Sequence, residues 1–293
     1  MSRALIAGIK KLREASESGL PCSMLSAAQL TALDDLARSS GCIEKIKQGA
    51  GRVFVINKPS VLEQHWRQLV PRDVGELAEH LPTRARNIAS ARSSKSSEHG
   101  HEISYLLLKS SAENVLWHDG KGNSINLSEI TDTLGAAGLA VNGGSGWVTT
   151  STLWLVENQE VFDRTDWLPG GQHASVAYYR GNLSNTVIDW LGKRNRSPTI
   201  WHFPDYDGVG LLNYARLKEK MGDAIRLWLM PNWRMLLKEM GNEKVWADTQ
   251  IQFNAMLNHP GYHAFEPEVK ELVDALRRSG MALEQESVWF ATT

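Results

Sequence analysis

The sequence predicts an α/β protein in which a parallel sheet flanked by helices forms the second half of the chain. Two observations support this class. From about residue 151 onward, short runs that are apolar almost throughout alternate with stretches of helical spacing, which is typical of parallel strands buried on both faces. The first 84 residues show instead helical patterns followed by a hairpin pattern, so we expect a separate N-terminal α+β region there.

Composition indicates a globular protein of a reducing compartment. Of the 293 residues, 42% are hydrophobic and 22% charged, which excludes a chain disordered throughout. Two cysteines are too few for a disulfide scaffold or a cysteine-rich zinc site, and no signal peptide or membrane-length apolar run appears. Residues 1–100 carry 15 Lys or Arg against 10 Asp or Glu, and the remainder carries 17 against 23. We therefore expect a cytoplasmic protein without membrane contact, with a front suited to a polyanion and a back suited to a metal.

The N-terminal region has the outline of a winged helix-turn-helix. A first helix is predicted in "ALIAGIKKLREAS", and a second one begins at Ser26 as N-cap and ends at Gly41. Two β-branched runs around "QGAG" then predict a hairpin, and a further helix starts at Pro59. We therefore predict that residues 1–84 form a winged-helix-like region.

Basic residues lie near the tip of the predicted hairpin. Lys45, Lys47 and Arg52 could contact the DNA backbone, as the wing of such a region does. The alternative is a hairpin that is simply solvated, because Asp34 and Asp35 on the preceding helix would repel phosphate. Both interpretations stay open at this point.

The middle of the chain predicts a linker and a small module. Residues 85–102, "ARNIASARSSKSSEHGHE", are Ser-rich and poor in apolar residues, so we expect a flexible linker or loop. Residues 103–150 contain the strand pattern "ISYLLLKSS", two short strands around Gly-Lys-Gly and a helix pattern. We predict a small α+β, CAP-like module there and place the border of the last domain, residues 151–293, near Thr150.

Acidic residues follow two strands of that last domain. Glu157 ends "LWLVEN", and Asp205 and Asp207 follow "IWHF" in "PDYDGVG". Because the carboxyl ends of parallel strands meet at one edge of the sheet, we expect these three carboxylates to converge. Carboxylate oxygens are ligands that Mg²⁺ or Mn²⁺ prefers. The alternatives are that Glu157 is an ordinary polar strand end and that Asp205 caps the following helix.

Two glycines accompany these acids. Gly181 ends a strand pattern in "YYRGN", and Gly208 directly follows Asp207. A residue without a side chain lets a phosphate or a metal approach the backbone closely. We therefore predict that a phosphate approaches the backbone at Gly181 and Gly208.

These motifs resemble the Toprim domain, the metal-binding fold of topoisomerases, primases and related nucleases. The likeness is closest to the Toprim nuclease subunit, JetD or MksG, of Wadjet-type plasmid-defence SMC complexes, which is itself similar to the topoisomerase VI A subunit. In those relatives a winged-helix, CAP-like module precedes the Toprim domain. The segment "ALEQESVWF" also resembles the "LEQE" segment that ends that family. By that match Glu284 and Glu286 become further candidate metal ligands.

The resemblance implies an activity and partners. Glu157 would be the general base or a metal ligand, and Asp205 and Asp207 would bind Mg²⁺ or Mn²⁺, with Glu284 or Glu286 completing the site. The protein would be a metal-dependent endonuclease that cleaves phosphodiesters of double-stranded DNA. It would act as a homodimer with an SMC-like ATPase complex in anti-plasmid or anti-phage defence, associated with the nucleoid.

Other functions stay open. "HFPDYDGVGLL" also resembles the nucleophile loop of HAD-type phosphatases, although only 86 residues follow Asp207 and that loop normally opens a longer domain. A non-catalytic DNA-binding or scaffold subunit would have the same fold without using its acids. Strand passage by a topoisomerase is disfavoured because Tyr105 is the only tyrosine before Thr150, and the pattern around Tyr105 predicts a buried strand.

Overall fold

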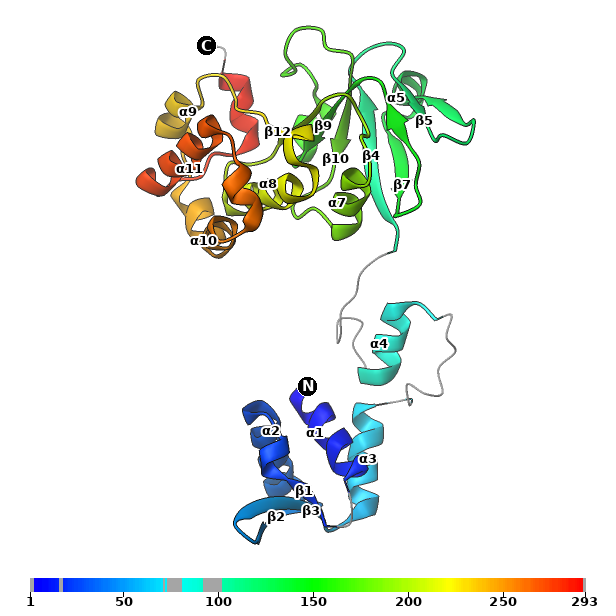
Figure 1. Ribbon diagram of the computed structural model, residues 1–293, viewed down its shortest axis with the longest axis vertical. Coiled ribbons are helices and arrows are strands. Elements are labelled where there is room, and N and C mark those ends of the chain that lie inside the picture. Colours follow the sequence, from blue (N-terminus) through cyan, green and yellow to red (C-terminus); the bar gives the residue numbers. More distant parts are fainter. Residues whose placement is uncertain (1–2, 16–17, 71, 73–80, 92–101, 292–293) are drawn as a thin grey trace. The chain divides into compact units, whose positions relative to one another are not determined.

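The computed structural model describes residues 3–15, 18–70, 72, 81–91 and 102–291. They belong to two compact units, one within residues 1–100 and the other within residues 101–293 (Figure 1). The division falls near residue 100 and not near Thr150, where the sequence predicts the last border. No helix within the described ranges is long and apolar enough to cross a membrane.

The N-terminal unit combines helices with a small antiparallel sheet. Its elements are, in order, α1 (Arg3–Glu14), β1 (Leu20–Pro21), the 3-10 helix η1 (Cys22–Met24), α2 (Ala27–Ser40), β2 (Ile43–Gln48), β3 (Gly51–Ile56), α3 (Pro59–Leu69) and α4 (Thr83–Ala91). The strands lie in the order β1-β3-β2, and both pairs are antiparallel. The predicted helices and the predicted hairpin of this unit are confirmed.

The helix α2 begins and ends where the sequence predicts. Ser26 Oγ accepts a hydrogen bond from the Gln29 backbone amide, and Gln29 Oε1 accepts one from the Ser26 amide, which together make a capping box. At the other end Gly41 has a φ of 60°, in the left-handed region where glycine carries no Cβ penalty. Leu33 of this helix and Phe54 of β3 are fully buried in the core of the unit.

The predicted linker at residues 85–102 begins as a helix. Residues 85–91 belong to α4, and residues 92–101 lie outside the described residues. The Ser-rich composition suggested a loop, but "TRARNIASA" contains three alanines and two arginines. Ala and Arg are among the strongest helix formers, so local propensity explains the difference.

The C-terminal unit is built around a mixed six-stranded sheet in the order β12-β11-β9-β10-β4-β7. Its elements are β4 (Ser104–Ser110), β5 (Leu116–His118), β6 (Ser124–Asn126), α5 (Leu127–Leu134), β7 (Ala137–Val141), β8 (Val148–Thr149), β9 (Thr152–Val156), α6 (Gln159–Asp163), β10 (Ala174–Tyr178), α7 (Asn185–Gly192), β11 (Ile200–Phe203), α8 (Gly208–Met221), η3 (Gly222–Ala224), β12 (Ile225–Leu227), α9 (Trp233–Met240), α10 (Glu243–Leu257), η4 (Pro260–Ala264), α11 (Pro267–Ser279) and η5 (Gln285–Phe290). β9 to β12 pair in parallel, whereas β4 is antiparallel to both of its neighbours. The α/β class is confirmed.

The strands predicted for a separate module at residues 103–150 belong to this unit. β4 pairs with β10, with Leu107 opposite Tyr178, and β7 extends the sheet beyond β4. β5 pairs with β6 and β8, and its Trp117 is fully buried and donates a hydrogen bond to Ser175 Oγ of β10 (2.9 Å). Tyr105 lies on a strand as predicted, but 72% of its surface is exposed. The hydrogen bonds between β4 and β10 therefore join two regions that sequence patterns separate.

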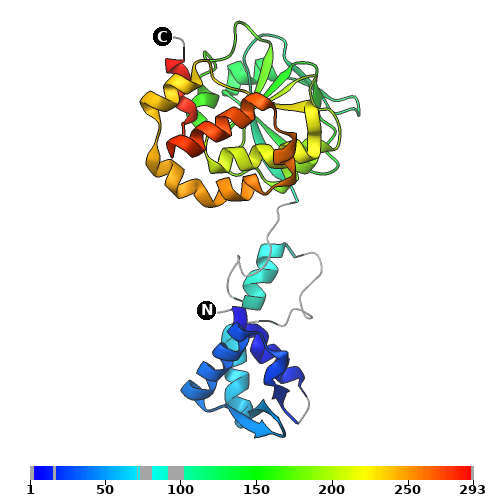
Figure 2. The ribbon, with the colours of Figure 1, turned by 60° about the vertical axis from the view of Figure 1, so that its left-hand side comes forward.

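Helices cover both faces of the sheet. Phe162 of α6 packs against Tyr178 of β10, with ring centroids 5.6 Å apart. Trp190 of α7 stacks on Trp117, which reaches Ser175 of the same strand. Ser175 and Tyr178 are three positions apart, so their side chains point to opposite faces. α8 packs beside α7 and α10 packs on α8, and the helices coloured yellow to red gather beside the sheet (Figures 1 and 2).

The parallel strands end together at one edge of the sheet. Val156 of β9 lies opposite both Tyr178 of β10 and Phe203 of β11. The chain passes from β9 to β10 on one side and then to β11 on the other side of β9. Ligands of open α/β sheets bind outside the carboxyl ends of the strands at such a switch point. Glu157, the residue after β9, therefore lies where this fold class places its ligands.

Candidate functional site

The structure brings the acids predicted at the strand ends to one place. Glu157 follows β9 directly, and Asp205 and Asp207 lie in the short loop between β11 and α8. Glu157 Oε2 accepts a hydrogen bond from the Asp205 backbone amide (3.4 Å). Glu157 is 7% exposed and Asp207 6%, so these carboxyl groups are largely shielded from water at the edge of the sheet.

The C-terminal segment brings two more acids to this edge. A β-bridge between Tyr206 and Leu283 holds the segment beside the Asp205 loop, through backbone hydrogen bonds of 2.8 and 3.1 Å. Glu284 is exposed and Glu286 half-buried. Both glutamates raise the pKa of Asp205 by repulsion, so they belong to the same electrostatic environment.

Two amide side chains that the sequence interpretation did not include hold this arrangement. Gln285 is fully buried, donates its backbone N–H to Asp205 Oδ1 (2.7 Å) and donates its side-chain amide to the Phe203 carbonyl. Its Oε1 accepts the Asn158 backbone N–H (2.9 Å). The Asn158 side-chain amide donates to Asp205 Oδ1 and to Glu286 Oε2 (3.0 Å each). These amides join the ends of β9 and β11 to the C-terminal segment.

Burial and repulsion raise the pKa of Glu157. Removal from water is the larger cause, and the negative charges of Asp205 and Asp207 add to it, so that the pKa rises to about 9. The hydrogen bonds from the Asp205 amide and the Tyr179 hydroxyl oppose this rise only in part. Without a cation, Glu157 therefore carries a proton at neutral pH.

The two aspartates are also affected. Burial raises the pKa of Asp205 to about 7, with a further contribution from the repulsion of Asp207, although the Gln285 amide opposes this rise. Burial raises the pKa of Asp207 as well, against the hydrogen bond that its Oδ1 accepts from the Gly210 amide (2.8 Å). That hydrogen bond makes Asp207, and not Asp205, the N-cap of α8.

A divalent cation fits this set of donors. None of the ion pairs between described residues involves any of the five acids of the site. A hard cation with oxygen ligands would relieve their repulsion. In the described ranges no three His, Cys, Asp or Glu side chains form a ready-made metal cage. Mg²⁺ does not require one, because it takes one or two carboxylates and keeps several waters.

A pair behind Glu157, the half-buried Tyr179 and the fully buried His202, also escaped the sequence interpretation. The Tyr179 hydroxyl lies 3.4 Å from Glu157 Oε2 and 2.8 Å from His202 Nε2. Burial lowers the pKa of His202 to about 3, so its ring is neutral. We assign the ring proton to Nε2, because Nδ1 has no hydrogen-bond partner among the described residues and the Tyr179 hydroxyl is then free to donate to Glu157. This pair orients the Glu157 carboxyl group.

The two glycines differ in what surrounds them. A Cβ on Gly208 would lie 2.0 Å from the Thr249 carbonyl oxygen of α10, and the Gly208 N–H donates to Thr249 Oγ1 (3.2 Å). The packing of α8 on α10 therefore fills the space beside the Gly208 Cα, through which the predicted phosphate would approach. Gly181 has a φ of 63° and open space around its Cα, as the prediction requires.

We expect Gly208→Ala to destabilise the protein by roughly 2–4 kcal/mol, because the added methyl group forces α8 away from α10. Gly181→Ala should cost only about 1 kcal/mol, since the left-handed backbone alone resists it. Chemical denaturation of the two variants measures the difference. A Gly208→Ala variant as stable as the wild type would contradict the packing described for Gly208.

The basic residues predicted to bind DNA lie in the N-terminal unit, and one of them is already engaged. Lys45 Nζ pairs with Asp34 (2.8 Å) and lies 5.5 Å from the centroid of the Phe54 ring. Its charge is therefore compensated within the unit, and the contact of Lys45 with DNA stays a prediction. Lys47 and Arg52 are exposed and lie opposite each other on β2 and β3.

Comparison with known proteins places the C-terminal unit in a family. No curated protein matches the chain. A family model described as a domain of unknown function (DUF7281) matches residues 132–291. This range includes β9 to β12 and all five acids of the site, and it covers more than half of the 293 residues. The chain therefore belongs to the DUF7281 family.

Proposed function

We propose that the protein is a Mg²⁺- or Mn²⁺-dependent DNA endonuclease whose active site is the acidic cluster of the C-terminal unit, in an arrangement of the Toprim type. The observation that carries this proposal is the convergence of Glu157, Asp205 and Asp207 at the switch point of the sheet. Burial and repulsion raise the pKa of each, and none of them has a basic partner among the described residues. Such a group binds a cation more readily than it serves the fold.

The residues at this site would have two different roles, binding of the ion and orientation of the carboxylates. Glu157, Asp205 and Asp207 would hold the ion, with Glu284 or Glu286 at its border. A bound ion would activate water and neutralise charge on the phosphodiester oxygens. Gln285 fixes the Asp205 carboxylate, and Tyr179 with His202 fixes that of Glu157.

The N-terminal unit supports DNA as the substrate. Its succession of helix, short strand, helix, hairpin and helix, with the sheet order β1-β3-β2, agrees with a winged-helix region. We propose that the β2–β3 hairpin is the wing, with Lys47 and Arg52 contacting the DNA backbone.

Charge reversal of the wing should weaken DNA binding. We expect Lys47→Glu with Arg52→Glu to lower the affinity for duplex DNA and to reduce the slope of log K against log salt by about 1 for each phosphate that is no longer neutralised. Lys10→Glu with Arg67→Glu, exposed positions on α1 and α3, is the charge-matched control. Fluorescence anisotropy at several salt concentrations measures the slopes. Equal slopes for the two double variants would remove the hairpin from the interface.

The likeness to Toprim nuclease subunits also leads us to propose partners. The chain would act as a homodimer beside an SMC-like ATPase complex in plasmid defence. Co-expression of the chain with such an ATPase, followed by purification through a tag on either protein, tests this association. Separate elution of the two proteins would contradict it.

The activity is tested with the purified full chain and supercoiled plasmid. We expect nicked or linear DNA with Mn²⁺ or Mg²⁺ and intact plasmid with EDTA. Calorimetric titration with Mn²⁺ tests the site independently of activity. Metal binding without DNA cleavage would favour the scaffold alternative or a required partner, and hydrolysis of p-nitrophenyl phosphate without cleavage would favour the phosphatase. Absence of metal binding would overturn the proposed site.

A further inference from the structure

The loop after β10 presents an unpaired arginine beside the acidic site. Tyr179 donates its backbone N–H to the Val156 carbonyl (3.2 Å), and its hydroxyl contacts Glu157. Arg180 comes next, is exposed and has a φ of 55°, a conformation that residues other than glycine rarely adopt. Among the described residues Arg180 has no hydrogen bond or ion pair. The backbone thus holds a strained, free cation at the carboxyl end of the strand next to Glu157, and such strain is concentrated at functional sites.

A second arginine stands behind this loop and lacks an anionic partner. Arg216 of α8 is half-buried and donates to the Oδ1 atoms of Asn182 (2.9 Å), Asn185 (2.7 Å) and Asn213 (3.0 Å). All three partners are neutral, and no ion pair between described residues includes Arg216. Buried charges are normally paired with opposite charges. Burial accordingly lowers the pKa of Arg216.

The amide groups around Arg216 shape the loop as well as bind the cation. Asn213 is fully buried, donates to the Gly181 carbonyl (3.0 Å) and accepts the Leu183 N–H (3.2 Å). The loop that carries Arg180 is therefore held rigidly at both Gly181 and Asn182. A rigid loop that carries Arg180 and is contacted by the uncompensated guanidinium group of Arg216 through Asn182 is suited to a fixed anion.

We propose that Arg180 and Arg216, with Asn182 and Asn185, bind a phosphate of the DNA backbone. This phosphate neighbours the scissile phosphate on the same strand. This subsite rests on the proposed nuclease function, because it assigns the substrate's second contact at the same sheet edge. Its task is positioning: it fixes the strand so that the scissile phosphate lies over Glu157 and Asp205. Gly181, which has open space around its Cα, lets the strand pass close to the loop.

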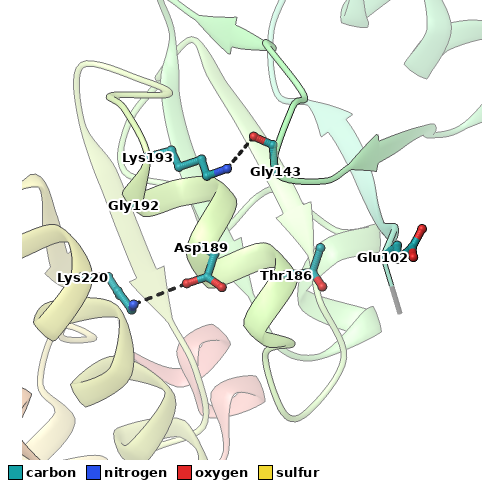
Figure 3. A pocket seen from close by; sticks show the side chains of 7 residues that line it. All are labelled: Glu102, Gly143, Thr186, Asp189, Gly192, Lys193 and Lys220. Carbon is teal, nitrogen blue, oxygen red and sulfur yellow. Dashed lines mark hydrogen bonds and ion pairs between the residues drawn. The ribbon is translucent and has the colours of Figure 1, made fainter. Parts of the chain in front are cut away.

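Two lysines near these arginines already have partners among the described residues, unlike Arg180. Figure 3 shows a surface hollow in which Lys220 of α8 pairs with Asp189 (3.5 Å) and Lys193 donates to the Gly143 carbonyl (2.7 Å). Lys220 is one turn beyond Arg216 on the same helix and carries the same charge. It is therefore a matched control for removing a cation from this face of α8.

The experiment uses the full chain, a fluorescein-labelled DNA duplex and Ca²⁺ in place of Mg²⁺. Arg180→Gly removes the charge and relieves the backbone strain, so its melting temperature should be unchanged or higher by up to ~3 °C. We expect its affinity for the duplex to fall about 5- to 10-fold and its salt slope to fall by about 1. Arg216→Gln should show the same reduction in slope, and Lys220→Gln should retain the wild-type slope.

The outcomes separate the subsite from the nuclease proposal. Wild-type affinity and slope in Arg180→Gly, in a protein that cleaves plasmid, would overturn the subsite and leave the nuclease intact. A loss in Lys220→Gln equal to that in Arg180→Gly would also overturn it, since general surface charge would then explain binding. Absence of duplex binding by the wild type overturns the subsite too, whereas absence of Mn²⁺ binding in the separate calorimetric titration overturns the nuclease. Plasmid cleavage by Arg180→Gly that is restored by raising the DNA concentration would support a positioning role.

Discussion

Glu157→Gln is expected to lower metal-dependent DNA cleavage by roughly 10²–10⁴-fold while leaving the protein folded. The substitution keeps the size of the side chain and its contact with Tyr179 but removes the negative charge at the switch point of the sheet. It also removes the buried acid whose pKa is raised to about 9 by burial and, to a smaller extent, by repulsion from Asp205 and Asp207. The metal-free variant should therefore melt at a higher temperature than the wild type at pH 8.

A loss of activity with a gain of stability distinguishes a functional acid from a structural one. Plasmid cleavage and thermal melting, measured on the same preparation, provide both values. Glu160→Gln, three residues further on the exposed side of α6, is the matched control and should change neither. Wild-type cleavage by Glu157→Gln would refute the assignment, and reduced stability of that variant would indicate that Glu157 serves the fold.

Asp207 requires a different choice of variant because it has two roles. Its Oδ1 caps α8 through the Gly210 amide (2.8 Å) and its charge belongs to the acidic cluster. Asp207→Ala removes both roles and should cost about 1 kcal/mol of stability because the cap is removed. Asp207→Asn can keep the cap, so a cleavage defect in this variant reports on the charge. Both variants should lose cleavage to the same extent as Glu157→Gln.

The positions of the acids could be predicted because they depend on local pattern and on a general property of parallel sheets. Apolar runs ending in Glu157 and before Asp205 identify strand ends, and parallel strands end at one edge. The residues that fix the acids could not be found in this way. Gln285 reaches Asn158 across 127 positions of the chain, and only the folded structure shows which amide meets which carboxylate. Tyr179 and His202 likewise look like ordinary residues of apolar strands.

The division of the chain near residue 100, where the sequence predicts a border near Thr150, could not be foreseen for a related reason. Hydrogen bonds between β4 and β10 join segments that lie some 70 residues apart in the sequence. No local sequence pattern predicts such a pairing. Three of the five residues of the edge strand β7, "AGLAV", are Ala or Gly, so its pattern is weak. Lys45 shows the same limit on the scale of one side chain. In the sequence Asp34 is only an acid that would repel DNA, whereas in the structure it is the ion-pair partner of Lys45.

Without divalent cations, the protein should lose stability as the pH rises from about 5 to about 9. The folded state holds the proton of Glu157 up to a pH of about 9, against an ordinary pKa of 4.5 in the unfolded chain, and that of Asp205 up to about 7, against 3.8. The stability linked to these raised pKa values is fully present below the unfolded values and is lost as the pH passes the folded ones. Because one pKa unit corresponds to about 1.4 kcal/mol, we expect the melting temperature to fall by at least ~5 °C between pH 5.5 and pH 8.5.

Mn²⁺ or Mg²⁺ should reverse this dependence, because a cation binds the ionised carboxylates of the folded state and not the protonated ones. At pH 8.5, metal at about 100 times its Kd should restore roughly 2.7 kcal/mol, whereas at pH 5.5 it should have little effect, since Glu157 and Asp205 are then protonated. Melting curves at the two pH values, with metal or EDTA, measure both effects, and Glu157→Gln should flatten the metal-free profile. A metal-free protein that is more stable at pH 8.5 than at pH 5.5 would contradict the raised pKa values. An equal effect of metal at both pH values would place the bound ion away from these carboxylates. A metal effect confined to pH 8.5 would tie the metal site to the acids without any assay of cleavage.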